Sequence, residues 1–148
     1  FVKYIIGDMK VKKFLSTLLV LFITASYGLC ATNSYDRYGS KTGSYKTNSS
    51  GTITQYDKYG SKTGSYKKTF SGYNSYDKFG SKTGSYKTSG STTTEYDKYG
   101  SKVGSYKTSG STTTAYDKYG HKTGSYKKDS SGRITEYDKY GHKVGSYK

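Results

Sequence analysis

The chain has 148 residues, of which 20 are tyrosine and one is cysteine, and its formal net charge is +15. The single cysteine, Cys30, excludes an intramolecular disulfide framework, and a hydrophobic content of 30% argues against a large aliphatic core. A surface this basic attracts polyanions, but charge alone does not distinguish nucleic acid from acidic polysaccharide, wall polymer or lipid headgroups.

Two leading segments precede the rest of the chain. Residues 1–8 are interpreted as an upstream extension or remnant, because the only methionine is Met9. After Met9, three lysines precede an apolar run from Phe14 to Ile23 and a stretch of small residues. This pattern is typical of a helical secretory signal peptide, which we place at residues 9–31 and which is the only expected membrane contact. The cleavage site, and whether Cys30 carries a lipid, stay open.

Residues 32–148 carry 21 Lys or Arg, nine acidic residues and 18 of the tyrosines, which gives a net charge of +12. So few aliphatic residues at this charge are typical of disorder. Tyrosine changes that expectation, because its ring buries a large area while its hydroxyl stays in contact with water. We therefore expect an ordered chain, with a largely disordered one as an alternative.

The same residues, 32–148, contain six near-identical copies of a twelve-residue block, YDKYGSKTGSYK. The copies begin at Tyr35, Tyr56, Tyr76, Tyr96, Tyr116 and Tyr137. Their regular spacing indicates a tandem repeat array. An array presents the same chemistry several times, which favours multivalent binding or scaffolding over a single catalytic site.

Each unit predicts two short strands and two turns. In the last unit, Arg133–Tyr137 and Lys143–Tyr147 favour strands, and Asp138–Gly141 fits a type I turn with Asp first and Gly fourth. Some units are one residue longer than others, and the extra residue lies in the linking turn. We expect that turn to change from a two-residue to a three-residue loop. An insertion within a strand would instead move all later side chains to the opposite face of the sheet.

These units predict an all-β fold in which tandem hairpins of about 20 residues form an elongated meander sheet. The alternative ordered fold is a β-solenoid, but a solenoid usually encloses an aliphatic interior that this unit lacks. The second glycine of the block, such as Gly104, is expected to let a neighbouring tyrosine ring lie on bare backbone.

The stretch GRITEYDKYG at Gly132–Gly141 resembles the YD repeat of bacterial secreted and surface proteins, in which Gly follows Tyr-Asp three positions on. The resemblance covers the six units and implies spiralling β-sheets in a bacterial protein that is secreted or at the cell surface. The Gly-Ser-Tyr-Lys block departs from that family's usual continuation, and six units are too few to form the shell of its large members. A weaker likeness is to aromatic wall-binding repeats of Gram-positive surface proteins, which use tryptophan, absent here.

Repeated tyrosine and lysine are the candidate polymer-binding residues. Cations hold phosphates, sulfates or carboxylates, while aromatic rings stack on sugars or bases. In the alternative interpretation, the tyrosines pack one face and the lysines keep the sheet soluble. The candidates are Tyr56, Tyr59, Tyr66, Lys58, Lys62, Lys67, Tyr96, Tyr99, Tyr106, Lys98, Lys102, Lys107, Tyr116, Tyr119, Tyr126, Lys118, Lys122 and Lys127.

No catalytic or metal site is predicted. One aspartate per turn, followed by a cation, suits turn formation better than calcium binding. His121 and His142 replace the serine of the other units, but no third histidine or further cysteine completes a zinc site. Phosphate-loop, dinucleotide and metalloprotease spacings are absent. We therefore expect a non-enzymatic protein without a cofactor.

These observations predict an exported repeat protein that binds anionic surface or matrix polymers through repeated Tyr and Lys contacts. The expected partner is an anionic polysaccharide, a wall polymer or another polyanion. The alternatives are a structural protein that self-assembles through exposed strand edges, and a nucleic-acid-binding protein.

Overall fold

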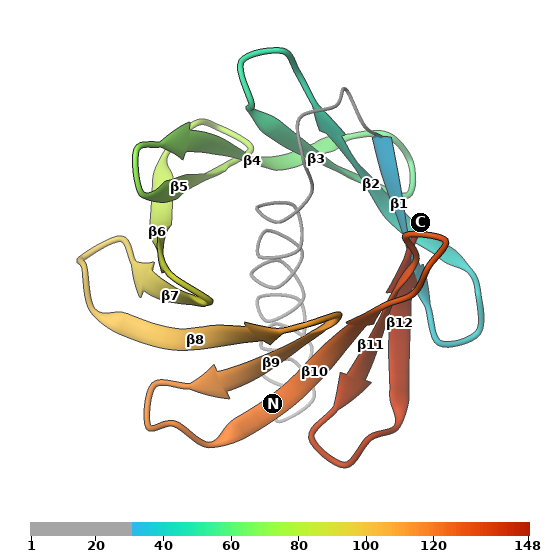
Figure 1. The fold of residues 1–148 in the computed structure, drawn as a ribbon. Helices are drawn as coiled ribbons and strands as arrows, with labels where there is room; N and C mark the ends of the chain where they lie inside the picture. Colours follow the sequence, from blue (N-terminus) through green and yellow to red (C-terminus); the bar gives the residue numbers. More distant parts are fainter. Residues whose placement is uncertain (1–30) are drawn as a thin grey trace, which may run out of the picture.

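The computed structural model describes residues 31–148, which form twelve antiparallel strands (Figure 1). The upstream extension, Cys30 and the predicted signal peptide up to residue 30 lie outside the described residues. Within residues 31–148 no helix is long and apolar enough to cross a membrane. The strands are β1 (Ala31–Asp36), β2 (Lys41–Thr47), β3 (Ile53–Asp57), β4 (Lys62–Thr69), β5 (Gly72–Asp77), β6 (Lys82–Ser89), β7 (Thr92–Asp97), β8 (Lys102–Ser109), β9 (Thr112–Asp117), β10 (Lys122–Lys128), β11 (Ile134–Asp138) and β12 (Lys143–Tyr147).

The sheet closes into a barrel. Each strand pairs with its neighbours along the chain, and β1 also pairs with β12. At this seam the Asn33 amide donates to the Lys148 carbonyl at 2.7 Å, and the Lys148 amide donates to the Asn33 carbonyl at 2.9 Å. The predicted all-β hairpins are confirmed, but a closed barrel replaces the elongated meander and its alternatives, the solenoid and the disordered chain. The closed barrel is favoured over an open sheet because closure pairs the two strand edges that an open sheet leaves exposed.

The turns within the repeated blocks have the predicted type I geometry. In the turn after β7, the Gly100 amide donates to the Asp97 carbonyl at 3.1 Å, and Gly100 has a φ of +87°. The Asp97 carboxylate oxygen Oδ1 accepts hydrogen bonds from the amides of Tyr99 and Ser101, both at 2.9 Å. The same arrangement recurs in the other five turns, at Asp36, Asp57, Asp77, Asp117 and Asp138. The prediction that these aspartates form turns is confirmed.

The linking turns absorb the difference in unit length, also as predicted. In a longer unit, the Asn48 amide donates to the Thr52 carbonyl at 3.0 Å, so that three residues form the loop. In a shorter unit, Thr69 pairs directly with Gly72 across a two-residue loop. Because the insertion stays outside the strands, equivalent side chains lie on the same face of the sheet in every unit.

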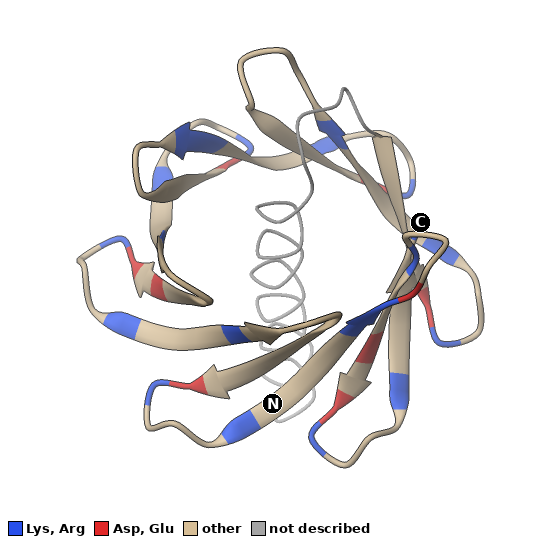
Figure 2. Cartoon of the chain, viewed as in Figure 1, with Lys and Arg blue, Asp and Glu red and all other residues tan. Residues whose placement is uncertain are grey.

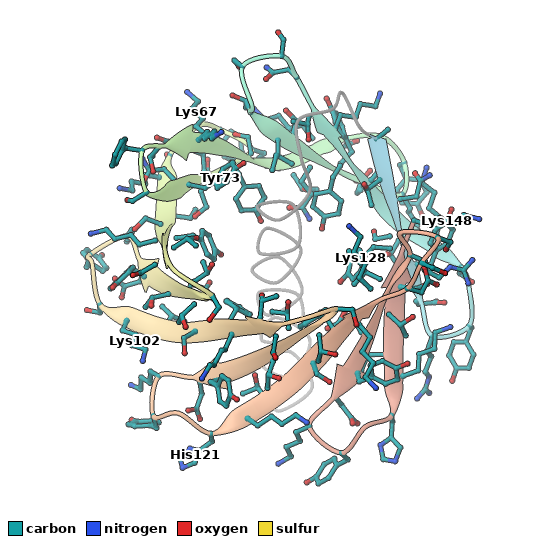
Figure 3. All side chains as sticks on the ribbon, viewed as in Figure 1. Lys67, Tyr73, Lys102, His121, Lys128 and Lys148 are labelled. Atoms are coloured by element: carbon teal, nitrogen blue, oxygen red, sulfur yellow. The ribbon has the colours of Figure 1, made fainter. Side chains whose placement is uncertain are left out.

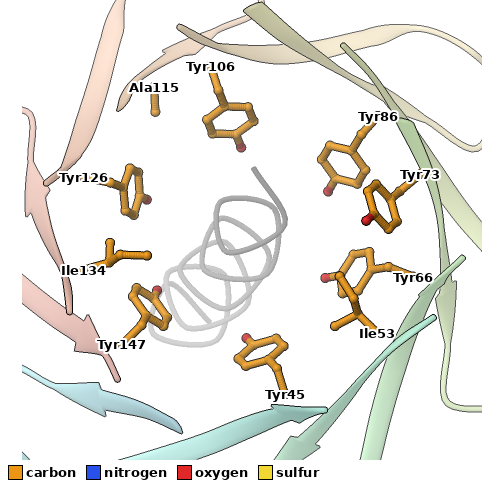
Figure 4. Close-up of a cluster of buried hydrophobic side chains, with 10 residues drawn as sticks. All are labelled: Tyr45, Ile53, Tyr66, Tyr73, Tyr86, Tyr106, Ala115, Tyr126, Ile134 and Tyr147. Atoms are coloured by element: carbon orange, nitrogen blue, oxygen red, sulfur yellow. The ribbon is translucent and has the colours of Figure 1, made fainter. Parts of the chain in front are cut away.

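Tyrosines from the even-numbered strands line the interior (Figure 4). They leave only 1–6% of their surface accessible. These inner tyrosines are Tyr45, Tyr66, Tyr86, Tyr106, Tyr126 and Tyr147. Tyr73 and three aliphatic residues, Ile53, Ala115 and Ile134, are buried beside them. The interior is therefore mainly aromatic, which is how a chain with few aliphatic residues forms a buried layer.

A glycine in each of the strands β2, β4, β6, β8 and β10 permits close approach to the next strand. A Cβ atom at Gly104 would lie 2.7 Å from the backbone carbonyl oxygen of Tyr116 in β9. The same contact is 2.5–2.8 Å at Gly43, Gly64, Gly84 and Gly124. The close neighbour is thus a backbone carbonyl, and not the tyrosine ring that we expected over Gly104. The sequence could not show this because the neighbour comes from a different unit.

We expect Gly104→Ala to lower the free energy of unfolding by about 1–3 kcal/mol, because the added methyl group would force two strands apart. Ser101→Ala, in the exposed turn of the same hairpin, is the control and should change stability by less than about 0.5 kcal/mol. Urea unfolding followed by circular dichroism measures both variants. Equal midpoints for the two would contradict the close approach at Gly104.

Candidate functional site

Six exposed aromatic rings lie at one end of the barrel, where the odd-numbered strands end. Each ring sits in an Asp-containing turn, and because all six turns follow an odd-numbered strand they share that end. Between 74% and 82% of each ring residue is accessible. The six residues, which we call the aromatic rim, are Tyr38, Tyr59, Phe79, Tyr99, Tyr119 and Tyr140. Exposed rings concentrated in this way are typical of a binding surface.

A cation stacks on each ring of the aromatic rim. In five turns, the ammonium nitrogen of the preceding lysine lies 4.8–4.9 Å from the ring centroid. In the first turn, Arg37 Cζ lies 4.6 Å from the Tyr38 centroid, and the guanidinium also donates to the Tyr38 hydroxyl. An exposed cation–π pair contributes about 0.5–1 kcal/mol. Each of these six turns, which we call the tips of the rim, therefore presents a ring and a positive charge together.

The charge at this end of the barrel is positive despite the turn aspartates. Each turn holds one aspartate, one cation on the ring, and one lysine that opens the next strand, such as Lys102. Lys102 and His121 point outward in Figure 3, and Figure 2 shows acidic and basic segments next to each other in the turns. Two cations against one aspartate in each of six turns leave a net charge of +6.

Histidine takes the place of serine in the last two turns. His121 Nδ1 lies 3.1 Å from Asp117 Oδ2, and His142 Nδ1 lies 3.0 Å from Asp138 Oδ2. Partial desolvation raises the pKa of these two carboxyl groups, but hydrogen bonds from the histidine amide and side chain outweigh it, so the pKa is lowered. Among residues 31–148, no three His, Cys, Asp or Glu side chains gather closely enough to hold a metal ion.

A second set of cation–aromatic pairs lies on the outer wall. Its rings are the first tyrosines of the blocks, which are half-buried between strands. The pairs are Lys46 with Tyr56, Lys67 with Tyr76, and Lys87 with Tyr96, with 5.1–5.5 Å between ammonium nitrogen and ring centroid. These rings present less surface to a ligand than those of the aromatic rim.

A buried carboxylate lies inside the barrel wall at Glu136, which is 8% exposed. Tyr126 and Tyr147 donate their hydroxyl hydrogens to its two oxygens at 3.0 and 2.8 Å. Burial raises the pKa of the Glu136 carboxyl group, the two tyrosine hydrogen bonds oppose this, and the net shift is upward. Burial, together with the Glu136 charge, also raises the pKa of Tyr147, so this phenol remains a hydrogen-bond donor.

The equivalent position carries a large polar residue in every second unit. Glu95 accepts hydrogen bonds from Tyr86 and Tyr106, at 2.9 Å each. Gln55 holds the same place in the second unit, and its buried Oε1 atom accepts no hydrogen bond. The other three units carry small residues there, namely Ser34, Ser75 and Ala115. These inner polar residues were not predicted from the sequence, although this alternation of large and small residues before each Tyr-Asp pair could have indicated them.

The structure divides the predicted binding residues among three places. On or beside the aromatic rim lie Tyr59, Lys58, Lys62, Tyr99, Lys98, Lys102, Tyr119, Lys118 and Lys122. On the outer wall lie Tyr56, Lys67, Tyr96, Lys107, Tyr116 and Lys127. Buried in the interior lie Tyr66, Tyr106 and Tyr126. The last three cannot contact an external polymer, because their side chains point toward the barrel axis.

No protein-family model, curated protein or solved structure matches the chain. The resemblance to YD repeats therefore stays a prediction. What the protein does has to be inferred from the geometry of the aromatic rim and the outer wall.

We expect Glu136→Gln to be at least as stable as the unchanged protein at pH 8, because a buried carboxylate with a raised pKa prefers the neutral form. As the pH falls, Glu136 becomes protonated and the energetic cost of burying its charge disappears. The advantage of the variant in the free energy of unfolding should therefore shrink. Urea unfolding of both proteins between pH 8 and pH 5 measures this difference. An advantage that stays constant or grows toward pH 5 would show that the pKa of Glu136 is not raised.

Proposed function

We propose that the protein is a non-enzymatic binder of anionic polymers at the cell surface or in the extracellular matrix, and that the aromatic rim is its main contact surface. The observation that carries the proposal is the presence of six ring–cation pairs at one end of a single barrel. The exported location rests on the pattern of the leading residues.

Each tip of the rim offers the two kinds of contact that an anionic polymer needs. One face of Tyr99, for example, carries the Lys98 ammonium at 4.8 Å, and the high exposure of the ring leaves its other face accessible. An exposed ring stacks on a sugar or a base, while the lysines attract carboxylate, sulfate or phosphate groups. The turn aspartate competes little, because its Oδ1 atom already accepts two backbone hydrogen bonds.

Repetition compensates for the weakness of each contact. One exposed ring and one or two solvated cations bind a polymer weakly, but six tips held by one barrel act at a high effective concentration. A polymer that engages several tips therefore dissociates much more slowly than one that engages a single tip.

The barrel offers little support for self-assembly through strand edges. Every strand between residues 31 and 148 has a hydrogen-bonded neighbour on both sides. Pairing with another copy would require one of these ladders to open first. Nucleic acid remains a competing ligand that the binding experiment must include, since bases also stack on exposed rings.

Removing the six cations that stack on the rings of the aromatic rim should weaken polymer binding more than removing six cations from the outer wall and the C-terminus. The rim variant changes Arg37, Lys58, Lys78, Lys98, Lys118 and Lys139 to Gln. The matched control changes Lys46, Lys67, Lys87, Lys107, Lys127 and Lys148 to Gln, so both variants lose the same charge. Because each lost ionic contact lowers the salt slope by about one, we expect a clearly smaller slope for the rim variant.

Binding to heparin, purified wall polymer and DNA is measured from low to high salt, with uncharged dextran as the negative ligand. Equal losses in the two variants would mean that net charge, and not the aromatic rim, determines binding. If the unchanged protein binds none of the charged polymers at low salt, the proposed function is wrong. Tighter binding of DNA than of both acidic polysaccharides would favour the nucleic-acid alternative.

A further inference from the structure

The tips of the aromatic rim are regularly spaced. Neighbouring strands lie about 4.8 Å apart and each hairpin contributes two of them, so adjacent tips lie roughly 10–13 Å apart along the rim once the tilt of the strands in a barrel is included. The pairing of β1 with β12 makes the tip of Tyr140 a neighbour of the tip of Tyr38. The spacing therefore continues across the seam, and every tip has a neighbour on each side.

Rings and cations alternate along this series. At the tip after β7, Tyr99 carries the Lys98 ammonium on its ring, and exposed Lys102 begins the next strand. The next tip repeats the order with Tyr119, Lys118 and Lys122. Each step from one tip to the next thus offers one flat apolar contact and one site for an anionic group.

A matching polymer needs one neutral stacking face and one anionic group in each such step. Two linked sugar rings span a comparable length in an extended chain. Nucleic acids are charged more densely, with one phosphate for every base and about 3.4 Å per phosphate along each duplex strand. The aromatic rim therefore fits a linear polysaccharide in which neutral and acidic sugars alternate.

We propose that such a polysaccharide follows an arc of the aromatic rim with one disaccharide at each tip. The neutral sugar stacks on the exposed ring, and the acidic sugar faces the lysines beside it. This inference depends on the proposed function, because it names the class of polymer that the rim binds. It also predicts that contiguous tips bind one polysaccharide together. An isolated tip would bind only one disaccharide, independently of the other tips.

Two variants that lose the same number of tyrosines test the arc. Tyr99→Ala with Tyr119→Ala removes two adjacent rings and leaves four contiguous tips. Tyr59→Ala with Tyr119→Ala removes opposite rings and leaves runs of only two tips. All three tyrosines are highly exposed, so both variants should fold normally, which thermal unfolding checks.

The probe is a hexasaccharide of alternating N-acetylglucosamine and glucuronate, which would span three tips. Titration calorimetry on the full chain should show that the adjacent-ring variant binds about threefold more weakly than the unchanged protein, because fewer three-tip arcs remain. The opposite-ring variant should bind about tenfold or more weakly, because no three-tip arc remains. In the unchanged protein, affinity should rise from the disaccharide to the tetrasaccharide and again to the hexasaccharide.

Equal binding of the hexasaccharide by the two variants would overturn the arc. Two other probes test the alternating polymer: an oligogalacturonate hexamer, with an acid on every sugar, and a short oligothymidylate. If either bound more tightly than the alternating hexasaccharide, with the same order of affinities among the unchanged protein and the two variants, the alternating polymer would be wrong. In these cases salt-sensitive binding to heparin or wall polymer would still support the proposed function. If the unchanged protein bound neither heparin nor wall polymer, the proposed function itself would be wrong.

Discussion

The pairing of β1 with β12 is the contact on which the rest of the structure depends. In an open sheet, both faces of every hairpin would meet water, and the tyrosines of the two faces would be equivalent. Closure gives the sheet an inside and an outside, so that Tyr147 is 1% exposed while its neighbour Lys148 is exposed. The same closure makes the six turns of one end into a continuous series of neighbouring tips.

Closure also explains why one short block uses three tyrosines or their equivalents. In the fourth unit, Tyr96 lies on the outer wall, Tyr99 on the aromatic rim and Tyr106 in the interior. Each position meets a different physical demand: half-burial between strands, exposure at a turn, and burial beside hydrogen-bonded Glu95. The chain obtains an aromatic interior and an aromatic surface from the same residue type because tyrosine is both large and polar.

Much of this architecture could be predicted from local sequence, because turns and strands are local. The Asp-Lys-Tyr-Gly turns, the strands and the two loop lengths follow from residue types and spacing. Closure could not be predicted, because it depends on how the twist and register of twelve strands bring β1 beside β12. Before closure is known, little in the sequence distinguishes Tyr106 from Tyr96, since the inner face carries only three buried aliphatic residues, Ile53, Ala115 and Ile134. The rim tyrosines were therefore predicted as binding residues together with buried ones.

The six units differ at inner positions of the odd-numbered strands but agree at the aromatic rim. In successive units, the inner position occupied by Ile53 is filled by Tyr73, Thr93, Thr113 and Ile134, so the copies have diverged even where packing restricts them. At the exposed tips, where most substitutions change stability little, all six units keep an aromatic ring with a cation before it. The turn itself requires Asp and Gly, and it requires neither the ring nor the cation. Phe79 keeps the ring without the hydroxyl group, so the feature that all six tips share is the flat face of a ring next to a positive charge.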